Sequence, residues 1–511
     1  MKELSKIVQL IDKNKPRKLD FLSNEANNSK YAKLYQLIKA GTIKTDEEAA
    51  AHFYEDAKAV SQSAYRQLKS RFKERLINML FFLEKDKSEA SELQNATLYI
   101  HKEWAAINII YAKGDFLLAA KLAEDLLPYA IKYEVTETVL YIADRLRQGY
   151  GTQIANRHRY DELKKLQDTY MELWRLEILA RETFHDIRMD YIKSSATQTD
   201  SVEKAKRGST ILTPHLNNSD QKPTHQFITY TYAVRLAQFG NTTEDLHTAI
   251  ALCDEAIAAL SQKPFNPKRQ ITTFMNQKIA CYAQLKEQTA GEDVAKEALS
   301  LQTEGSFSWF KTLEYQALLA FNTKEYLKAF DIWQTAQKHK SFKSLTLQHA
   351  DIWQLFGAYL HFLVVSKKFK AETMKESKFR AVKFVNDIPT FNRDKEGMNI
   401  SALIAQIAIL IAEKKHSNIP DRLEALGKYW QRHIKKTDAS YRNYWFIKML
   451  QELPKGYYKR VSVQARTEAM LANLTAVPLK NEGESTKNEG KDAKSEVIPL
   501  EDLWAILLEL M

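Results

Sequence analysis

Apolar residues recur along most of the chain at steps of three and four, which places them on one face of a helix. The clearest stretch is 322–339, NTKEYLKAFDIWQTAQKH, in which large and small residues alternate at Tyr326, Ala329, Trp333 and Ala336. The same spacing returns at Phe116, Ala119, Ala123 and Leu126, and again at Leu246, Ala249, Cys253 and Ala256. Because a small alanine lets a neighbouring helix approach closely, each stretch predicts the second helix of a helix–turn–helix repeat.

This pattern resembles the repeats of the tetratricopeptide family over about residues 90–160 and 225–365. The resemblance implies an all-α fold, a right-handed solenoid of helical hairpins whose first helices line a concave groove. It also implies protein–protein interaction, with a peptide or helix of a partner held in that groove. On the first helices of two hairpins, the residues expected to contact such a partner are Gln277, Lys278, Tyr282, Lys311 and Glu314.

Residues 1–86 predict a separate small helical unit. Thr45 and Glu48 have the spacing of a capping box, and a longer helix begins at Ser61 or Ser63. That helix has an apolar stripe, and a basic face is formed by Arg66, Lys69, Arg71, Lys73 and Arg75. The arrangement loosely resembles a helix-turn-helix DNA-binding unit, although its turn lacks glycine and is longer. Two interpretations stay open: a solvated basic face, or contacts with DNA or RNA.

The rest of the chain divides by pattern into six segments. We predict a first helical-repeat block at 87–195, a polar linker at 196–223, tetratricopeptide-like repeats at 224–365, further helices at 366–478, a disordered tether at 479–497 and an amphipathic helix at 498–511. Within the first block, residues 157–195 predict one long helix with a near-heptad pattern that Glu177 interrupts. This helix either packs back on its neighbours or pairs with a second chain.

The predicted tether is poor in apolar residues and rich in Lys, Glu, Asn and Gly, which is typical of a disordered linker. The helix after it is acidic, and its apolar face consists of residues that include Leu500, Leu503, Trp504, Leu507 and Leu510. Two uses fit such a helix. It docks on its own chain as a cap, or it binds a groove on another protein.

Composition agrees with helices joined by short loops. Only 14 glycines and 11 prolines occur in 511 residues, which argues against sheet-rich and dinucleotide-binding folds. The net charge of +11 is mild for this length and permits, without requiring, a nucleic-acid or acidic partner. Cys253 and Cys281 lack partners at metal-ligand spacing, and no signal peptide or membrane-spanning stretch is visible. We therefore expect a cytoplasmic protein with no membrane partner.

The sequence contains no recognisable catalytic or cofactor motif. The phosphate-loop, dinucleotide-binding, nucleophile-elbow and zinc-protease patterns are all missing. Glu-x-x-His pairs occur at Glu182/His185, Glu244/His247 and Glu413/His416, but their positions do not suggest convergent ligands. We expect no cofactor, no metal and no enzyme activity, and interpret the chain as a protein–protein interaction scaffold or adaptor. The alternative is a nucleic-acid-binding regulator that joins the N-terminal unit to a tetratricopeptide-like sensing domain.

Two further features have ordinary structural interpretations. Trp309, Trp333 and Trp353 recur at intervals that favour core packing between repeat helices over a ligand box. The basic run 367–383 indicates a solvated helix, with contact to an acidic partner or a phosphate backbone as the alternative. Nothing in the pattern specifies an oligomeric state.

Overall fold

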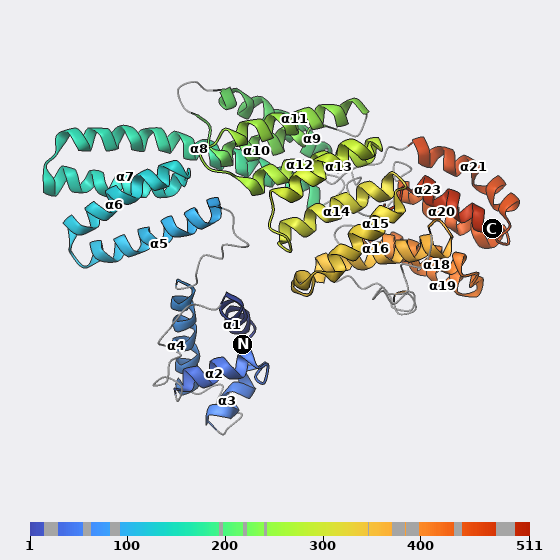
Figure 1. The fold of residues 1–511 in the computed structure, drawn as a ribbon, viewed down its shortest axis with the longest axis horizontal. Coiled ribbons are helices and arrows are strands. Elements are labelled where there is room, and N and C mark those ends of the chain that lie inside the picture. The colour runs from blue at the N-terminus through green and yellow to red at the C-terminus, as the bar shows by residue number, and fades with distance from the viewer. Residues whose placement is uncertain are drawn as a thin grey trace. The chain divides into compact units, whose positions relative to one another are not determined.

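A computed structural model of the protein describes residues 1–14, 29–54, 63–81, 92–193, 198–217, 222–239, 243–345, 347–369, 384, 398–433, 442–476 and 496–511. Every regular element in these ranges is a helix, as the hydrophobic spacing predicts. The described chain divides into two compact units, Met1–Asp115 and Phe116–Met511. Their helices are labelled in Figure 1. Within the ranges above, none of the helices has both the length and the apolar character needed to cross a bilayer.

In the first unit, the described residues form the helices α1 (Lys2–Asn14), α2 (Lys30–Lys39), α3 (Asp46–Tyr54), α4 (Ser63–Leu80) and α5 (Glu92–Ala112). Its core joins the apolar stripe of α4, including Phe72 and Leu76, to Leu34 of α2 and Val8 of α1. The capping box is confirmed, because Glu48 N donates to Thr45 Oγ1 at 3.2 Å and Thr45 N donates to Glu48 Oε2 at 3.1 Å. Residues 55–62, between α3 and α4, lie outside the described ranges.

The boundary between the units falls at residues 115 and 116, whereas the sequence pattern suggests a boundary at 86 and 87. Gly114 and Asp115 form a short turn that looks like the tip of a helical hairpin, so the pattern assigns α5 to the repeats. Gly114 does adopt a left-handed conformation, with φ of +87°, as a glycine after a helix commonly does.

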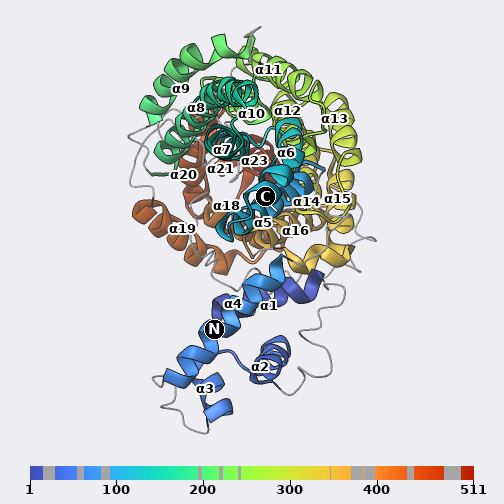
Figure 2. The ribbon, with the colours of Figure 1, turned by 90° about the vertical axis from the view of Figure 1, so that its left-hand side faces the viewer.

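The second unit contains the remaining helices: α6 (Phe116–Lys132), α7 (Thr136–Gly149), α8 (Arg157–Lys193), α9 (Gln198–Leu212), α10 (His225–Leu236), α11 (Thr243–Ser261), α12 (Lys268–Leu285), α13 (Gln288–Ser300), α14 (Phe307–Asn322), α15 (Tyr326–Lys338), α16 (Leu347–Val365), α18 (Met398–Ala412), α19 (Ile419–His433), α20 (Arg442–Lys455), α21 (Arg460–Ala476) and α23 (Leu500–Leu510). Each helix from α6 onward packs against the next described one, and α12 also packs against α14. In Figure 2, α11, α13 and α15 lie on the outer side of a curved array and α10, α12 and α14 on its inner side.

The residues with repeat spacing form the contact faces of these helices. Tyr326, Ala329, Trp333 and Ala336 are all buried in α15, and Ala249, Cys253 and Ala256 are fully buried in α11. The Trp333 indole N–H donates to the Trp353 carbonyl oxygen at 2.8 Å. Trp309 and Trp353 are buried in the same cluster, so the interpretation of these tryptophans as core residues is confirmed.

The turns after α12, α14, α16 and α18 repeat one backbone motif. Each contains a lysine with positive φ: Lys286, Lys324, Lys367 and Lys414. The residue after each lysine donates its backbone N–H to a carbonyl five residues earlier, as in Glu287 to Tyr282 and Glu325 to Ala320, both at 2.9 Å. This is the Schellman ending of a helix, and it exposes a lysine at each of these four turns.

The predicted polar linker at 196–223 is wrong over much of its length, because α9 occupies Gln198–Leu212. Ala205 and Leu212 are fully buried, and a Cβ on Gly208 would meet Thr183 Cγ2 of α8 at 2.5 Å. Small residues at helical spacing allow α9 to pack tightly against α8. The polar composition of the segment conceals this face.

The long predicted helix is confirmed as α8, which has 37 residues. It packs against α7, α9 and α10 of its own chain, as the hairpin interpretation expects. Glu177, which interrupts the heptad pattern, is buried and accepts a hydrogen bond from Thr136 Oγ1 at 2.7 Å. Burial raises the pKa of Glu177, and the hydrogen bond opposes this effect.

We predict that Ser306→Ala loosens the first turn of α14. Ser306 Oγ accepts a hydrogen bond from Trp309 N at 3.2 Å, and loss of such an N-cap costs about 1 kcal/mol. Hydrogen exchange should become faster in the first turn of α14. The control is Thr335→Ala on the exposed side of α15, and equal exchange in the two variants would contradict the prediction.

Candidate functional site

Residues 496–511 pack into the second unit, and their apolar side chains join its largest core cluster. Val497, Ile498, Leu500, Leu503, Trp504, Ile506 and Leu507 are all buried. Helix α23 packs against α18 and α21, and the Trp504 ring meets Phe446 of α20 edge-on with 6.0 Å between ring centroids. Of the two uses expected for this helix, the structure shows docking on its own chain.

The end of the predicted tether is therefore wrong, because Glu496 and Val497 are buried. The rest of that segment, 479–495, lies outside the described residues. Leu510, which the apolar pattern assigns to the docking face, is only partly buried at the edge of the cluster.

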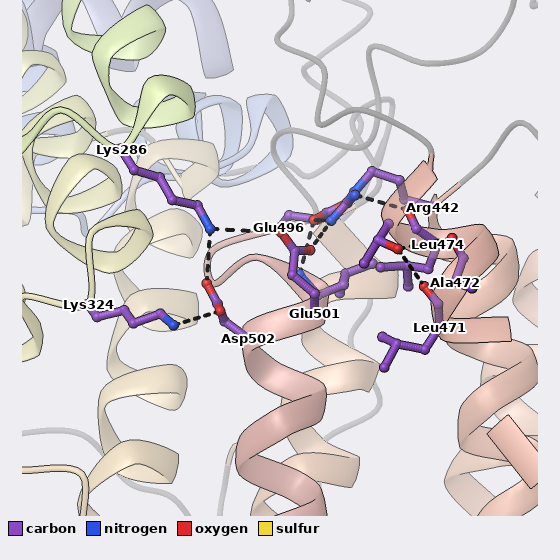
Figure 3. A network of polar contacts seen from close by, with 11 residues as sticks. Lys286, Lys324, Arg442, Leu471, Ala472, Leu474, Glu496, Glu501 and Asp502 are labelled. Atoms are coloured by element: carbon purple, nitrogen blue, oxygen red, sulfur yellow. Dashed lines mark hydrogen bonds and ion pairs between the residues drawn. The ribbon is translucent and has the colours of Figure 1, made fainter. Parts of the chain in front are cut away.

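Arg442, at the start of α20, holds the beginning of the docked segment (Figure 3). Its side chain is 3% exposed, and its Nε and one terminal nitrogen donate to the Glu496 carboxylate at 2.8 and 3.1 Å. The same guanidinium also donates to Glu501 and, at 3.2 Å, to the carbonyl oxygen of Leu474 at the end of α21. Glu496 in turn accepts from Leu500 N at 3.2 Å, so it caps α23.

Lysines from the repeated turns meet the acidic side of α23. Asp502 lies 2.8 Å from Lys324 Nζ and 3.4 Å from Lys286 Nζ, and both lysines reach toward it in Figure 3. Lys286 Nζ also lies 4.0 Å from Glu501, and Lys368, directly after the turn residue Lys367, lies 2.5 Å from Glu509. Each carboxylate of residues 496–511 is thus paired with a base from elsewhere in the second unit.

Burial and these ion-pair partners shift the pKa values of the acidic groups at and near α23. Burial raises the pKa of Glu496, and the charge of Arg442 opposes that rise. Burial together with the nearby Asp502 charge raises the pKa of Tyr326, at the start of α15, to about 12. The hydrogen bond from Lys368 lowers the pKa of Glu509.

We call this arrangement the helix-binding site: the apolar surface of α18 and α21 together with Arg442, Lys286, Lys324 and Lys368. It combines an apolar surface for one face of a helix with cations for the carboxylates beside that face.

The groove residues expected from the family resemblance lie on α12 and α14. Lys278 Nζ pairs with Asp254 at 2.6 Å, and Tyr282 packs partly buried between α11, α13 and α14. Gln277 of α12 is also partly buried.

Glu314 of α14 is only 3% exposed. Its carboxylate accepts a hydrogen bond from Lys311 Nζ at 2.7 Å and lies 3.4 Å from His349 Nδ1. Burial alone would raise the pKa of Glu314, but Lys311 and His349 outweigh it and lower that pKa.

The basic residues of α4 are partly engaged within the first unit. Lys69 Nζ lies 2.7 Å from Asp46, Lys73 Nζ lies 2.8 Å from Glu3, and the Arg75 guanidinium lies 4.1 Å from the centre of the Tyr31 ring. Arg66 and Arg71 are exposed on the same helix. Nucleic-acid contact by these five residues stays a prediction.

We predict that Asp46 gives the first unit an acid-sensitive element. Partial burial alone would raise the pKa of Asp46, but hydrogen bonds from Lys69 and Tyr65 outweigh it and lower that pKa to about 2. Because the folded pKa lies below the unfolded one, this stabilisation is complete above about pH 4 and is lost as pH falls towards 2. The effect is about 1 kcal/mol, since solvent screens this partly exposed group.

Thermal unfolding followed between pH 2 and 5 checks this, with Asp46→Asn as the comparison. The difference in stability between wild type and Asp46→Asn should shrink as the pH falls through that window. A difference that stays constant would contradict the assignment.

The other candidate features give no second site. Within the described ranges, no group of three or more His, Cys, Asp or Glu side chains is placed to hold a metal ion. A carboxylate oxygen of Glu413 lies 3.7 Å from His361 Nε2 of α16. Cys253 and Cys281 are both buried. Most of the basic run, 370–383, lies outside the described residues.

Sequence reasoning identified the docking helix but missed the residues that receive it. The four receiving residues are far from α23 in the sequence: Arg442, Lys286, Lys324 and Lys368. Each lies at or near a helix end, where a basic residue is common and gives no sign of a binding role. One signal was available: residues 496–511 carry Glu496, Glu501, Asp502 and Glu509 and no basic residue, which indicates basic partners for this segment. Comparison with protein-family models, with curated proteins and with solved structures gave no match.

Proposed function

We propose that this protein is a non-enzymatic scaffold or adaptor whose second unit is a tetratricopeptide-like solenoid of helical hairpins. In this proposal α10/α11, α12/α13 and α14/α15 are successive hairpins, with the first helix of each on the inner side of the curve. The order of packing, the buried alanines of α11 and α15 and the repeated Schellman turns all support that arrangement. Solenoids of this kind present extended binding surfaces.

The docked helix α23 is the observation that carries the proposal. The second unit holds an amphipathic helix by burying its apolar face and pairing its carboxylates with Arg442, Lys286, Lys324 and Lys368. A surface that binds one helix with such complementarity is suited to binding proteins. The family resemblance points to the same function.

Cross-linking capture tests this function with the full chain. The tagged protein is cross-linked in cells that express it, and partners and cross-linked positions are identified by mass spectrometry. We expect one or a few proteins in near-stoichiometric yield, with cross-links to the second unit.

Capture of nucleic acid through the first unit would instead favour the alternative regulator. Its diagnostic is fluorescence polarisation with duplex DNA and RNA at about 50 to 200 mM salt, since phosphate contacts weaken steeply over that range. Binding that disappears when Arg66, Lys69 and Lys73 become glutamate would support the regulator and contradict the scaffold. Because Lys69 and Lys73 already pair with carboxylates, we favour the scaffold.

A further inference from the structure

We propose that the helix-binding site receives an acidic amphipathic helix of a partner protein, and that residues 496–511 occupy the same site as a built-in competitor. This inference rests on the proposed scaffold function and specifies both the partner's chemistry and its regulation. The chain's own helix shows what the site selects.

Charge complementarity defines the first requirement. The site contains Arg442 and three lysines. These cations pair with the carboxylates of the docked segment, which are Glu496, Glu501, Asp502 and Glu509. Lys286 and Lys324 lie in the turns after α12 and α14. From there they pair with Glu501 and Asp502, the adjacent carboxylates at the start of α23. A partner helix therefore needs an acidic first turn and a further acid about two turns later.

Shape defines the second requirement. The buried residues Leu500, Leu503, Trp504 and Leu507 lie on one helical stripe against α18, α20 and α21. The Trp504 indole N–H is buried, and no described residue accepts a hydrogen bond from it. An unpaired buried donor weakens docking, so a partner helix with phenylalanine at this position should fit better than the resident helix.

Covalent attachment explains how a less than optimal segment still occupies the site. A segment on the same chain competes at an effective concentration on the order of millimolar. A free partner binds only in proportion to the fraction of time for which the resident helix is undocked. Occupancy by α23 therefore sets a threshold for partner binding.

A charge-swap experiment on the full chain tests the proposal. The probe is a fluorescent peptide of residues 496–511 carrying Trp504→Phe, and the released chain carries Leu503→Ala and Leu507→Ala to weaken its own helix. We expect the probe to bind the released chain at least ten-fold more tightly than the wild-type chain. Adding Lys286→Glu and Lys324→Glu to the released chain should reduce binding by at least ten-fold.

Compensation separates recognition from misfolding. A probe with Glu501→Lys and Asp502→Lys should bind the charge-reversed released chain better than it binds the released chain itself. Circular dichroism and thermal unfolding show whether each variant is folded. The proposal would be overturned by a folded released chain that does not bind the probe, or by one that binds both probes equally.

Two other outcomes also decide the question. Light scattering that shows dimers held together by exchange of residues 496–511 would make a second copy the occupant and overturn the partner assignment. Cellular partners captured equally by the wild-type chain and by the Lys286→Glu, Lys324→Glu variant would keep the scaffold function and overturn this site. Probe binding with no captured protein would keep the site's chemistry and overturn the scaffold function.

Discussion

Trp504→Ala is expected to loosen the docking of α23 by about 3–5 kcal/mol, the usual effect of truncating a large buried aromatic side chain. The Trp504 side chain is 1% exposed and packs on Phe446 within the largest core cluster. Since each 1.4 kcal/mol is a factor of ten, amide exchange in α23 should become faster by roughly two to four orders of magnitude. Hydrogen-exchange mass spectrometry of residues 500–510 measures this directly.

Ala505→Ser is the matched control, because Ala505 is next in sequence but faces solvent. It should leave exchange in α23 nearly unchanged. Exchange that increases equally in both variants would show that the docking does not depend on the buried face. Exchange in α10 and α11 should stay as in wild type, because α23 packs chiefly against α18 and α21.

Arg442→Met is expected to be equally damaging, because it leaves Glu496 buried without its countercharge. Breaking one side of a buried ion pair typically costs about 3–5 kcal/mol, more than the net contribution of the intact pair. Arg442 also bridges Glu501 and the Leu474 carbonyl, so its loss removes polar contacts that link α20, α21 and α23. We expect a lower midpoint of thermal unfolding and faster exchange at residues 496–510.

The pH dependence of this variant has a defined sign. Burial raises the folded-state pKa of Glu496, and removal of Arg442 raises it further. The protonated acid tolerates burial, so docking should be better preserved near pH 4.5 and lost as the pH rises through that pKa. Adding Glu496→Gln should restore part of the docking at neutral pH. A double variant no better than Arg442→Met alone would contradict this account.

The helices were predictable because each depends on local spacing. The apolar periods identify α8, α11, α15 and α23 without knowledge of their neighbours. The position of α9 was missed because most of its buried face consists of serine, alanine and glycine, with Leu212 only at its end, so its apolar signal is weak. The period of the apolar residues indicates which helix face is buried only when that face contains large apolar side chains.

The site was half predictable for a related reason. The stripe from Leu500 to Leu507 predicted that α23 buries one face, yet periodicity carries no information about the surface that covers it. Lys324 and Asp502 are 2.8 Å apart but belong to turns and helices far apart in the chain. Likewise, the pattern placed Glu314 on a helix face without showing that Lys311 and His349 would enclose it.

The lysines at the turns after α12 and α14 lower the stability of the fold while they supply charges that bind α23. A non-glycine residue with positive φ carries backbone strain, about 1 kcal/mol or more, that glycine would relieve. Lys286 and Lys324 have φ of 59° and 65°, and their ammonium groups are the ones that reach Asp502. A search for more heat-resistant variants should therefore select glycine at these turns. The resulting proteins would unfold at higher temperature while losing the charges that hold an acidic helix.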